Sequence, residues 1–220
     1  MLSALMNNNM SVKYIIGIDE VGRGPLAGRV FVGAVLLPKK FPKNFFKTAP
    51  APLRDSKKLS HIQREKWLTW MKANDVIFTT SAASANTIDK RHIHRTIHFA
   101  ATRVARRIFK KTQIDFKETH IITDGGIIIQ EKSWQWQSLP KADENYPAVS
   151  LASIAAKVLR DREMDRLHKK YPRYGFNKHK GYGTAAHIKA IKKYGPSPIH
   201  RRSFIRGITS SKPKSNVSAQ

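Results

Sequence analysis

Short apolar runs alternate with glycine-, proline- and lysine-rich stretches along this chain, a pattern typical of an α/β protein. Runs over residues 12–18, 30–37 and 76–83 are rich in β-branched residues and have the length of strands. The glycine-rich connection between the first two predicts a β-hairpin. Two further strand-like runs, over 120–124 and 134–139, each end at or near an acidic residue.

Helical periodicity fills most of the intervening segments. Ser60 and Gln63 have the spacing of a capping box, which predicts the start of a helix. Thr184 is a candidate N-cap for the last helix, which Gly195 is expected to end. The predicted helices cover 61–72, run unbroken from Thr87 to Ile108, begin again at Pro147, and extend from Thr184 to about Tyr194.

The length of 220 residues suits one domain with a sizeable core, expected over 12–207. Residues 1–11 and 208–220 are both expected to be disordered tails. The amino-terminal segment is neither a secretory signal nor an Arg-rich transit peptide, which favours the cytoplasm. No apolar run approaches the roughly 18 residues of a membrane span, so no membrane association is expected.

The charge balance narrows the function further. The chain has 41 Lys and Arg against 15 Asp and Glu, a net charge of +26, which predicts a polyanionic partner and favours nucleic acid. A membrane-surface protein is disfavoured because no basic helix with a large apolar face is present. The absence of cysteine excludes disulfides, thiolate zinc sites and cysteine nucleophiles. Basic and aromatic residues alternate over 171–183, and 200–204 forms a second predicted basic patch.

The end of the first strand carries the most distinctive chemistry. Asp19 and Glu20 are followed at once by a loop containing Gly22, Arg23 and Gly24. The loop could hold a phosphate, but two carboxylates would repel that phosphate unless a divalent cation lay between them. An ordinary strand-turn with solvated acids explains this stretch equally well when it is considered alone.

Other strand ends favour the first interpretation. Asp124 ends the 120–124 run, and Asp143 follows the 134–139 run. Carboxylates that follow several strands in a very basic chain indicate metal-assisted phosphodiester hydrolysis. Hard oxygen ligands favour Mg²⁺ or Mn²⁺, and two ions would stabilise the attacking and leaving oxygens. No G-x-S-x-G motif supports a serine nucleophile.

Seven segments, in order along nearly the whole chain, resemble the ribonuclease HII family of type 2 ribonucleases H. They are residues 17–28, 55–60, 123–125, 141–143, 152–161, 179–184 and 200–204. The resemblance implies a ribonuclease-H-like fold, with a mixed five-stranded sheet flanked by helices and a helical carboxyl-terminal portion. The chain departs from the family pattern at Ala142, at Leu151 and over 126–139.

The resemblance also implies an activity. It is endonucleolytic cleavage of the RNA strand of RNA/DNA hybrids, and cleavage on the 5′ side of single ribonucleotides embedded in duplex DNA. The products carry 3′-hydroxyl and 5′-phosphate ends, and the implied role is ribonucleotide removal during DNA replication and repair.

Family roles transfer to matching positions of this chain. Asp19, Glu20, Asp124 and Asp143 match the metal-binding carboxylates, which are expected to hold two ions in the substrate complex. The implied substrate contacts are the 2′-hydroxyl-reading loop Gly22, Arg23 and Gly24, the sugar-packing Tyr182, and the phosphate-binding Ser56, Lys57, Ser153 and Lys157.

A second hypothesis uses the same charge without catalysis. A non-catalytic basic nucleic-acid-binding protein would explain the charge and leave the acids incidental. The tail lacks a recognisable clamp-binding peptide, so no obligate protein partner is expected, and self-repulsion favours a monomer.

Overall fold

The computed structural model describes residues 12–53 and 56–209. Five strands form one sheet in the order β3-β2-β1-β4-β5. Strands β1, β2 and β3 pair antiparallel, whereas β1 with β4 and β4 with β5 pair parallel. The predicted β-hairpin and mixed five-stranded sheet are therefore confirmed. The strands are β1 (Tyr14–Val21), β2 (Val30–Pro38), β3 (Ile77–Ala83), β4 (Thr119–Asp124) and β5 (Gln135–Leu139).

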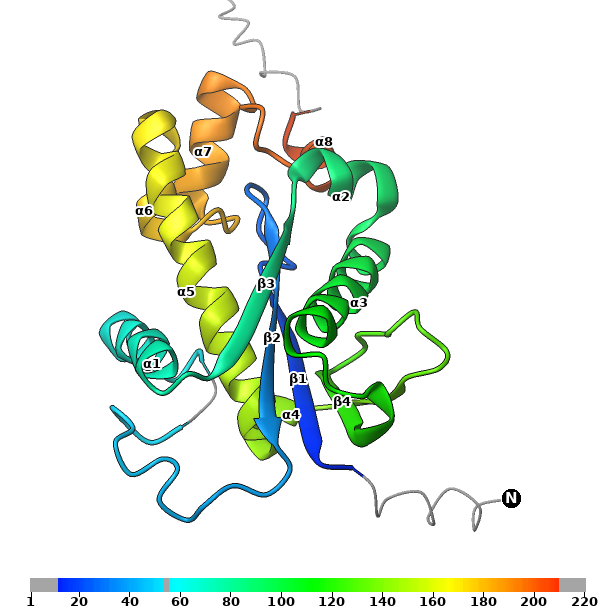
Figure 1. The fold of residues 1–220 in the computed structure, drawn as a ribbon. Helices are drawn as coiled ribbons and strands as arrows, with labels where there is room; N and C mark the ends of the chain where they lie inside the picture. Colours follow the sequence, from blue (N-terminus) through cyan, green and yellow to red (C-terminus); the bar gives the residue numbers. More distant parts are fainter. Residues whose placement is uncertain (1–11, 54–55, 210–220) are drawn as a thin grey trace, which may run out of the picture.

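Helices cover both faces of the sheet. Figure 1 shows α1 and α5 on one side and α3 on the other, with α6, α7 and α8 near the end where β1 turns into β2. None of the helices within 12–53 and 56–209 is long and apolar enough to cross a membrane. The helices are α1 (His61–Ala73), α2 (Ala85–Arg91), α3 (Ile93–Thr112), α4 (Ala142–Asn145), α5 (Pro147–Lys170), α6 (Phe176–His179), α7 (Ala185–Tyr194) and α8 (Arg202–Thr209).

Local signals predicted two helix starts correctly. Ser60 accepts from the Gln63 amide while the Gln63 side chain accepts from the Ser60 amide, so the capping box is complete. Thr184 accepts from the amide of the third residue of α7 and is its N-cap.

The predicted unbroken helix from Thr87 is wrong. It divides into α2 and α3 at His92, whose φ of 62° lies in the left-handed region and ends α2. Asp89 of α2 accepts from the backbone amides of Arg202 and Ser203 at the start of α8. This contact between distant segments fits the turned direction of α2, and helical periodicity carries no signal for it.

The carboxyl-terminal portion contains more helix than predicted. The 171–183 segment includes the 3₁₀ turn Pro172–Tyr174 and α6. Helix α8 begins at Arg202, inside the predicted basic patch at 200–204. Residues 208 and 209 belong to α8, so the expectation that disorder begins at 208 is wrong for these two. The expectations for 1–11 and 210–220, and the motif residue Asp55, lie outside the described residues.

Close packing of α5 on the sheet sets the position of everything that follows. A Cβ added to Gly17 of β1 would overlap the backbone of Ala148 and Val149, and one added to Gly33 of β2 would overlap the carbonyl of Ala152. Because side chains alternate along a strand, Gly17 and Asp19 share the face that α5 covers. The opposite face of β1 carries Ile16 and Ile18, which pack in the core beneath α3.

Gly17→Ala should lower the free energy of unfolding by about 3 kcal/mol, because a new methyl group has no space between β1 and α5. Gly207→Ala is the matched control: Gly207 is exposed in α8, with no atom within 4 Å of an added Cβ. That change should be neutral or stabilising by about 0.5 kcal/mol. Urea unfolding followed by circular dichroism measures both, and equal midpoints would contradict the packing argument.

Candidate active site

Three carboxylates lie at the same end of neighbouring strands. Asp19 and Glu20 are near the end of β1, and Asp124 ends β4. The parallel register pairs Ile18 with Thr123, which places Asp124 beside Asp19 at a strand spacing of about 4.8 Å. Asp19 is only 7% exposed on the α5 side, whereas alternation directs Glu20 towards the α3 side.

Asp143 is held near these carboxylates by a backbone hydrogen bond of the residue before it. Ala142 donates its amide to Oδ1 of Asp124 at 2.9 Å, and the half-buried Asp143 is the next residue, in the first turn of α4. Lys141, at φ 56°, turns the chain from the end of β5 into α4. The segment 126–139, which departs from the family pattern, thus forms a loop and β5 that lead to Asp143.

Burial makes Asp19 and Glu20 hard to ionise. Burial chiefly, and then the neighbouring charges of Glu20 and Asp124, raise the pKa of Asp19 well above its ordinary value. Burial also raises the pKa of Glu20 to about 7, although the charges of Arg23 and Lys57 oppose the rise. In the absence of a cation, both carboxyl groups therefore tend to keep a proton.

A hard divalent cation fits this donor set, because it would neutralise buried carboxylates without any protonation. In the described part of the chain, no three acidic or imidazole side chains already surround a common point in the manner of a metal site. The structure brings together the charges of Asp19, Glu20 and Asp124, with Asp143 one residue from the amide that holds Asp124.

Hydroxyl and ammonium groups line the α5 side of the acids. The Ser153 hydroxyl hydrogen-bonds to Asp19, and its oxygen lies 2.8 Å from that of Ser56. Lys157, one helical turn after Ser153, donates to Asp161 at 2.8 Å. Of the four predicted phosphate-binding residues, Ser56 and Ser153 thus lie beside Asp19, Lys157 follows on α5, and the charge of Lys57 acts on Glu20.

The glycine loop is held from beneath by a buried arginine. Arg201 donates to the carbonyls of Gly22, Arg23 and Gly28 at 2.7, 2.8 and 3.1 Å. The carbonyl and N–H of a trans peptide point in opposite directions. The amides of Arg23 and Gly24 therefore point away from Arg201, which leaves a pair of donors directed outwards.

A second buried arginine supports the same loop. Arg160 of α5 donates to the carbonyls of Arg29 and Lys180 at 3.2 and 2.9 Å. Its side chain occupies the space that a Cβ at Gly22 would need, and Gly22 also has φ 93°. Glycine is thus required at this position by conformation and by space. Burial lowers the pKa of Arg160, and lowers that of Arg201 to about 9.

Tyr182 lies at the surface, and a chain of two buried, hydrogen-bonded histidines holds its backbone. Its ring is 44% exposed and lies 5.8 Å from the Arg160 guanidinium. The backbone carbonyl of Tyr182 accepts from Nδ1 of His187, whose Nε2 lies 3.1 Å from Nε2 of His200. Burial lowers the pKa of both histidines to about 4, so both are neutral at pH 7. This pair of histidines fixes the backbone that carries the exposed ring of Tyr182.

Sequence reasoning missed these supporting residues. The predicted basic surface patch at 200–204 is wrong for His200 and Arg201, which are buried. Arg201 serves the glycine loop from nearly the opposite end of the chain, and His187 serves Tyr182. Neither charge nor spacing in the sequence distinguishes a buried arginine from an exposed one.

Removing the Glu20 charge should change the pH dependence of stability in metal-free protein. The raised pKa lets folded Glu20 keep a proton that unfolded Glu20 releases between about pH 4.5 and pH 7. Stability should therefore fall as pH rises through this window. Glu20→Gln should reduce that fall and exceed wild type by about 1–3 kcal/mol at about pH 8.

Urea unfolding at several pH values, with a chelator present, measures this difference. Asp75→Asn, which removes an exposed acid at the end of α1, should follow the wild-type curve. Parallel curves for wild type and Glu20→Gln would show that Glu20 ionises normally in the folded state.

Known proteins match this chain over nearly all of the residues that form the fold. The family model for ribonuclease HII matches residues 16–207. Ribonuclease HII of Coxiella burnetii (strain Dugway 5J108-111) is 40% identical over 190 residues, which cover 86% of this chain and 87% of that protein.

Solved structures agree on the fold. Ribonuclease HII of Archaeoglobus fulgidus, solved in a complex with PCNA, is 24% identical with a TM-score of 0.69, covering 91% of this chain and 98% of that chain. Bst-RNase HIII, solved with Mn²⁺, is 18% identical with a TM-score of 0.64, covering 86% and 66% respectively. The ribonuclease-H-like fold is thereby confirmed. The tail on which the expected absence of a clamp partner depends lies outside the described residues.

Proposed function

This chain belongs to the ribonuclease HII family, and we propose that it cleaves the RNA strand of RNA/DNA hybrids and the 5′ side of single ribonucleotides in duplex DNA. The observation that carries this proposal is the buried acid cluster at the end of β1 and β4, next to a loop with outward-directed amides. The cluster accounts for metal-dependent hydrolysis, and the loop accounts for recognition of the ribonucleotide.

Asp19, Glu20, Asp124 and Asp143 would hold the divalent ions, Mg²⁺ or Mn²⁺, with two ions in the substrate complex. Bound ions would activate a water and stabilise the negative charge that develops on the phosphate. The related Bst-RNase HIII binds Mn²⁺, which agrees with this donor set. Hydrolysis would leave 3′-hydroxyl and 5′-phosphate ends.

Selection of RNA over DNA requires a group that contacts the 2′-hydroxyl. The amides of Arg23 and Gly24 are suitable donors, because Arg201 binds the carbonyls of their peptide units from the interior. Because these amides are already held in place, the loop needs no rearrangement when a 2′-hydroxyl accepts from them. Tyr182 would pack its exposed ring on the sugar beyond the ribonucleotide.

The side chains of Ser56, Lys57, Ser153 and Lys157 would receive the substrate phosphates. Ser56 and Ser153 lie beside Asp19, and Lys57 and Lys157 add positive charge. The cellular role would be ribonucleotide removal during DNA replication and repair, carried out by a monomer without an obligate protein partner.

The acids also separate this function from a non-catalytic nucleic-acid-binding role. Buried carboxylates with raised pKa values cost stability, and they repel the phosphates that a binding protein must attract. A protein that only bound nucleic acid would gain affinity from neutral residues at these positions. Their presence beside the glycine loop therefore favours the enzyme.

Asp124→Asn should abolish nicking of a duplex with one embedded ribonucleotide in Mg²⁺ or Mn²⁺, while duplex binding survives. The reason is that the amide removes a charge needed for the metal but leaves the basic surface unchanged. Thermal unfolding with added Mn²⁺ gives a second measurement: wild type should be stabilised, and the variant much less so.

Asp75→Asn is the matched control and should nick at the wild-type rate. Undiminished nicking by Asp124→Asn would refute the site assignment. A wild-type protein that binds the duplex but nicks it with neither metal would support the non-catalytic alternative.

Tyr182→Ala should lower kcat/KM for a single embedded ribonucleotide by about tenfold to a hundredfold, because a ring-to-sugar contact of about 1–3 kcal/mol is lost. Tyr182→Phe keeps the ring and should stay within about threefold of wild type. Single-turnover nicking measures both variants. Equal losses for Phe and Ala would assign the role to the hydroxyl instead of the ring.

A further inference from the structure

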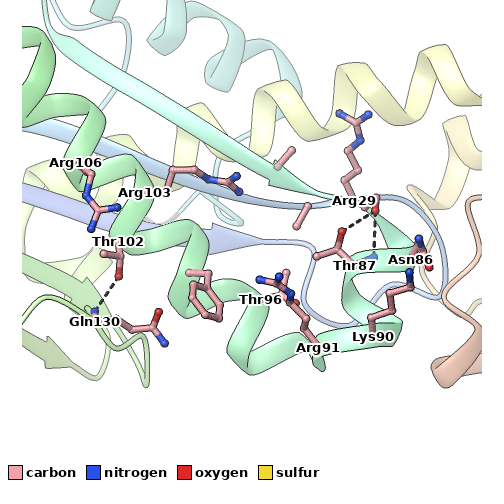
Figure 2. Close-up of a pocket in the computed structure, with 14 residues that line it drawn as sticks. Arg29, Asn86, Thr87, Lys90, Arg91, Thr96, Thr102, Arg103, Arg106 and Gln130 are labelled. Carbon is pink, nitrogen blue, oxygen red and sulfur yellow. Dashed lines mark hydrogen bonds between the residues drawn. The ribbon is translucent and has the colours of Figure 1, made fainter.

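A large basic hollow lies outside the acid cluster, between the end of β3, α2 and α3. Its volume is about 930 Å³. Figure 2 shows side chains from all three elements around it, with Lys90 and Arg91 from α2 and Arg103 and Arg106 from α3. Among the residues that the structure describes, none that lines it is acidic, in contrast to the acid cluster at the end of β1.

Its cations differ in how they are used. Arg29 lines the hollow but pairs with Glu163 of α5 at 3.3 Å, and Figure 2 shows its side chain directed away from the other cations. The Arg106 guanidinium lies 3.4 Å from the carboxylate of the half-buried Glu131. Within the described residues, Lys90, Arg91 and Arg103 make no ion pair with an acidic side chain.

An aromatic ring and small polar groups complete the lining. Phe99 is 50% exposed, and the Arg91 guanidinium lies 5.3 Å from the centre of its ring. This contact holds Arg91 over the hollow. Ser84, Asn86 and Thr87 add hydrogen-bonding groups at the start of α2. Cations beside neutral donors and an exposed ring are the features that bind a nucleic-acid backbone.

The strand register places this hollow close to the acid cluster. Ala82 lines the hollow and pairs with Phe31 of β2, and Phe31 pairs with Val21 at the end of β1. Two strand spacings, about 10 Å, therefore separate the hollow from the end of β1. Successive phosphates of one strand lie about 3.4 Å apart along the duplex axis, so the hollow is a few nucleotides from the carboxylates.

We propose that this hollow is a second nucleic-acid site, in which Lys90, Arg91 and Arg103 bind phosphates of the duplex arm that flanks the cleaved linkage. The site rests on the proposed function for its substrate and adds an anchor that contacts no reacting atom. It would raise affinity for substrates with a charged arm on that side and leave the chemical step unchanged.

Arg91→Gln with Arg103→Gln tests the site, because glutamine keeps the helices and removes the charge. Lys110→Gln with Lys111→Gln is the matched control, since both lysines are exposed at the far end of α3. Each protein is titrated with an all-DNA duplex by fluorescence anisotropy and assayed for nicking of a ribonucleotide-containing duplex. Both substrates are also made with uncharged methylphosphonate linkages in one arm or the other.

The hollow variant should bind the all-phosphodiester duplex about tenfold more weakly than wild type. The slope of its affinity against salt concentration should correspond to about two fewer phosphate contacts. Its KM for nicking should rise by a similar factor while kcat is unchanged. Methylphosphonates in one of the two arms should weaken duplex binding by the wild-type protein by the same factor. They should cause no further loss of affinity in the variant.

The proposal would be overturned if the hollow variant bound the duplex as tightly as the lysine control. It would also be overturned if the loss of affinity in the variant multiplied with the loss caused by methylphosphonates, whichever arm carried them. The two hypotheses fail separately. A wild-type protein that never nicks refutes the proposed function, whereas anisotropy with the all-DNA duplex still measures the contribution of the hollow.

Discussion

The contact between α5 and the sheet at Gly17 and Gly33 determines the rest of the site. Without side chains at these two positions, the helix backbone lies directly on β1 and β2. Asp19, two residues beyond Gly17, is therefore buried beneath α5 and meets Ser153. The same helix carries Arg160 to the glycine loop. A single close packing arrangement thus positions both the acids and the loop that lies beside them.

Charge is distributed in opposite senses on the surface and at the site. The chain carries +26 overall, yet the end of β1 concentrates acidic side chains, and burial chiefly raises the pKa values of Asp19 and Glu20 there. A basic surface attracts a polyanion over a long range. In the proposed function, a divalent ion bound by the acid cluster would then let a phosphate approach. The buried Arg201 serves neither purpose, because its donors hold the carbonyls of the glycine loop.

Much of the fold could be predicted because its signals are local. The β-branched runs, the Ser60 capping box and the Thr184 cap each depend on a few neighbouring residues, and each is present in the structure. The break at His92 and helix α8 could not be predicted, because contacts between α2 and α8 accompany them. The grouping of Asp19 with Asp124 depends on strand order, which periodicity did not give. The family resemblance implied the group of carboxylates but no order of strands.

The sequence by itself determined which groups are available: acids at strand ends, glycines in the loop after β1, and a large excess of basic residues. It also carried the family motifs that indicate their use. Only the tertiary structure decided which cations are buried supports and which are free at the surface. Arg201 and Arg91 look alike in the chain, yet one lies in the interior beneath the glycine loop and the other over Phe99 at an open hollow. The physical reason is that burial depends on contacts between distant segments, and burial decides whether an arginine supports the backbone or meets a ligand.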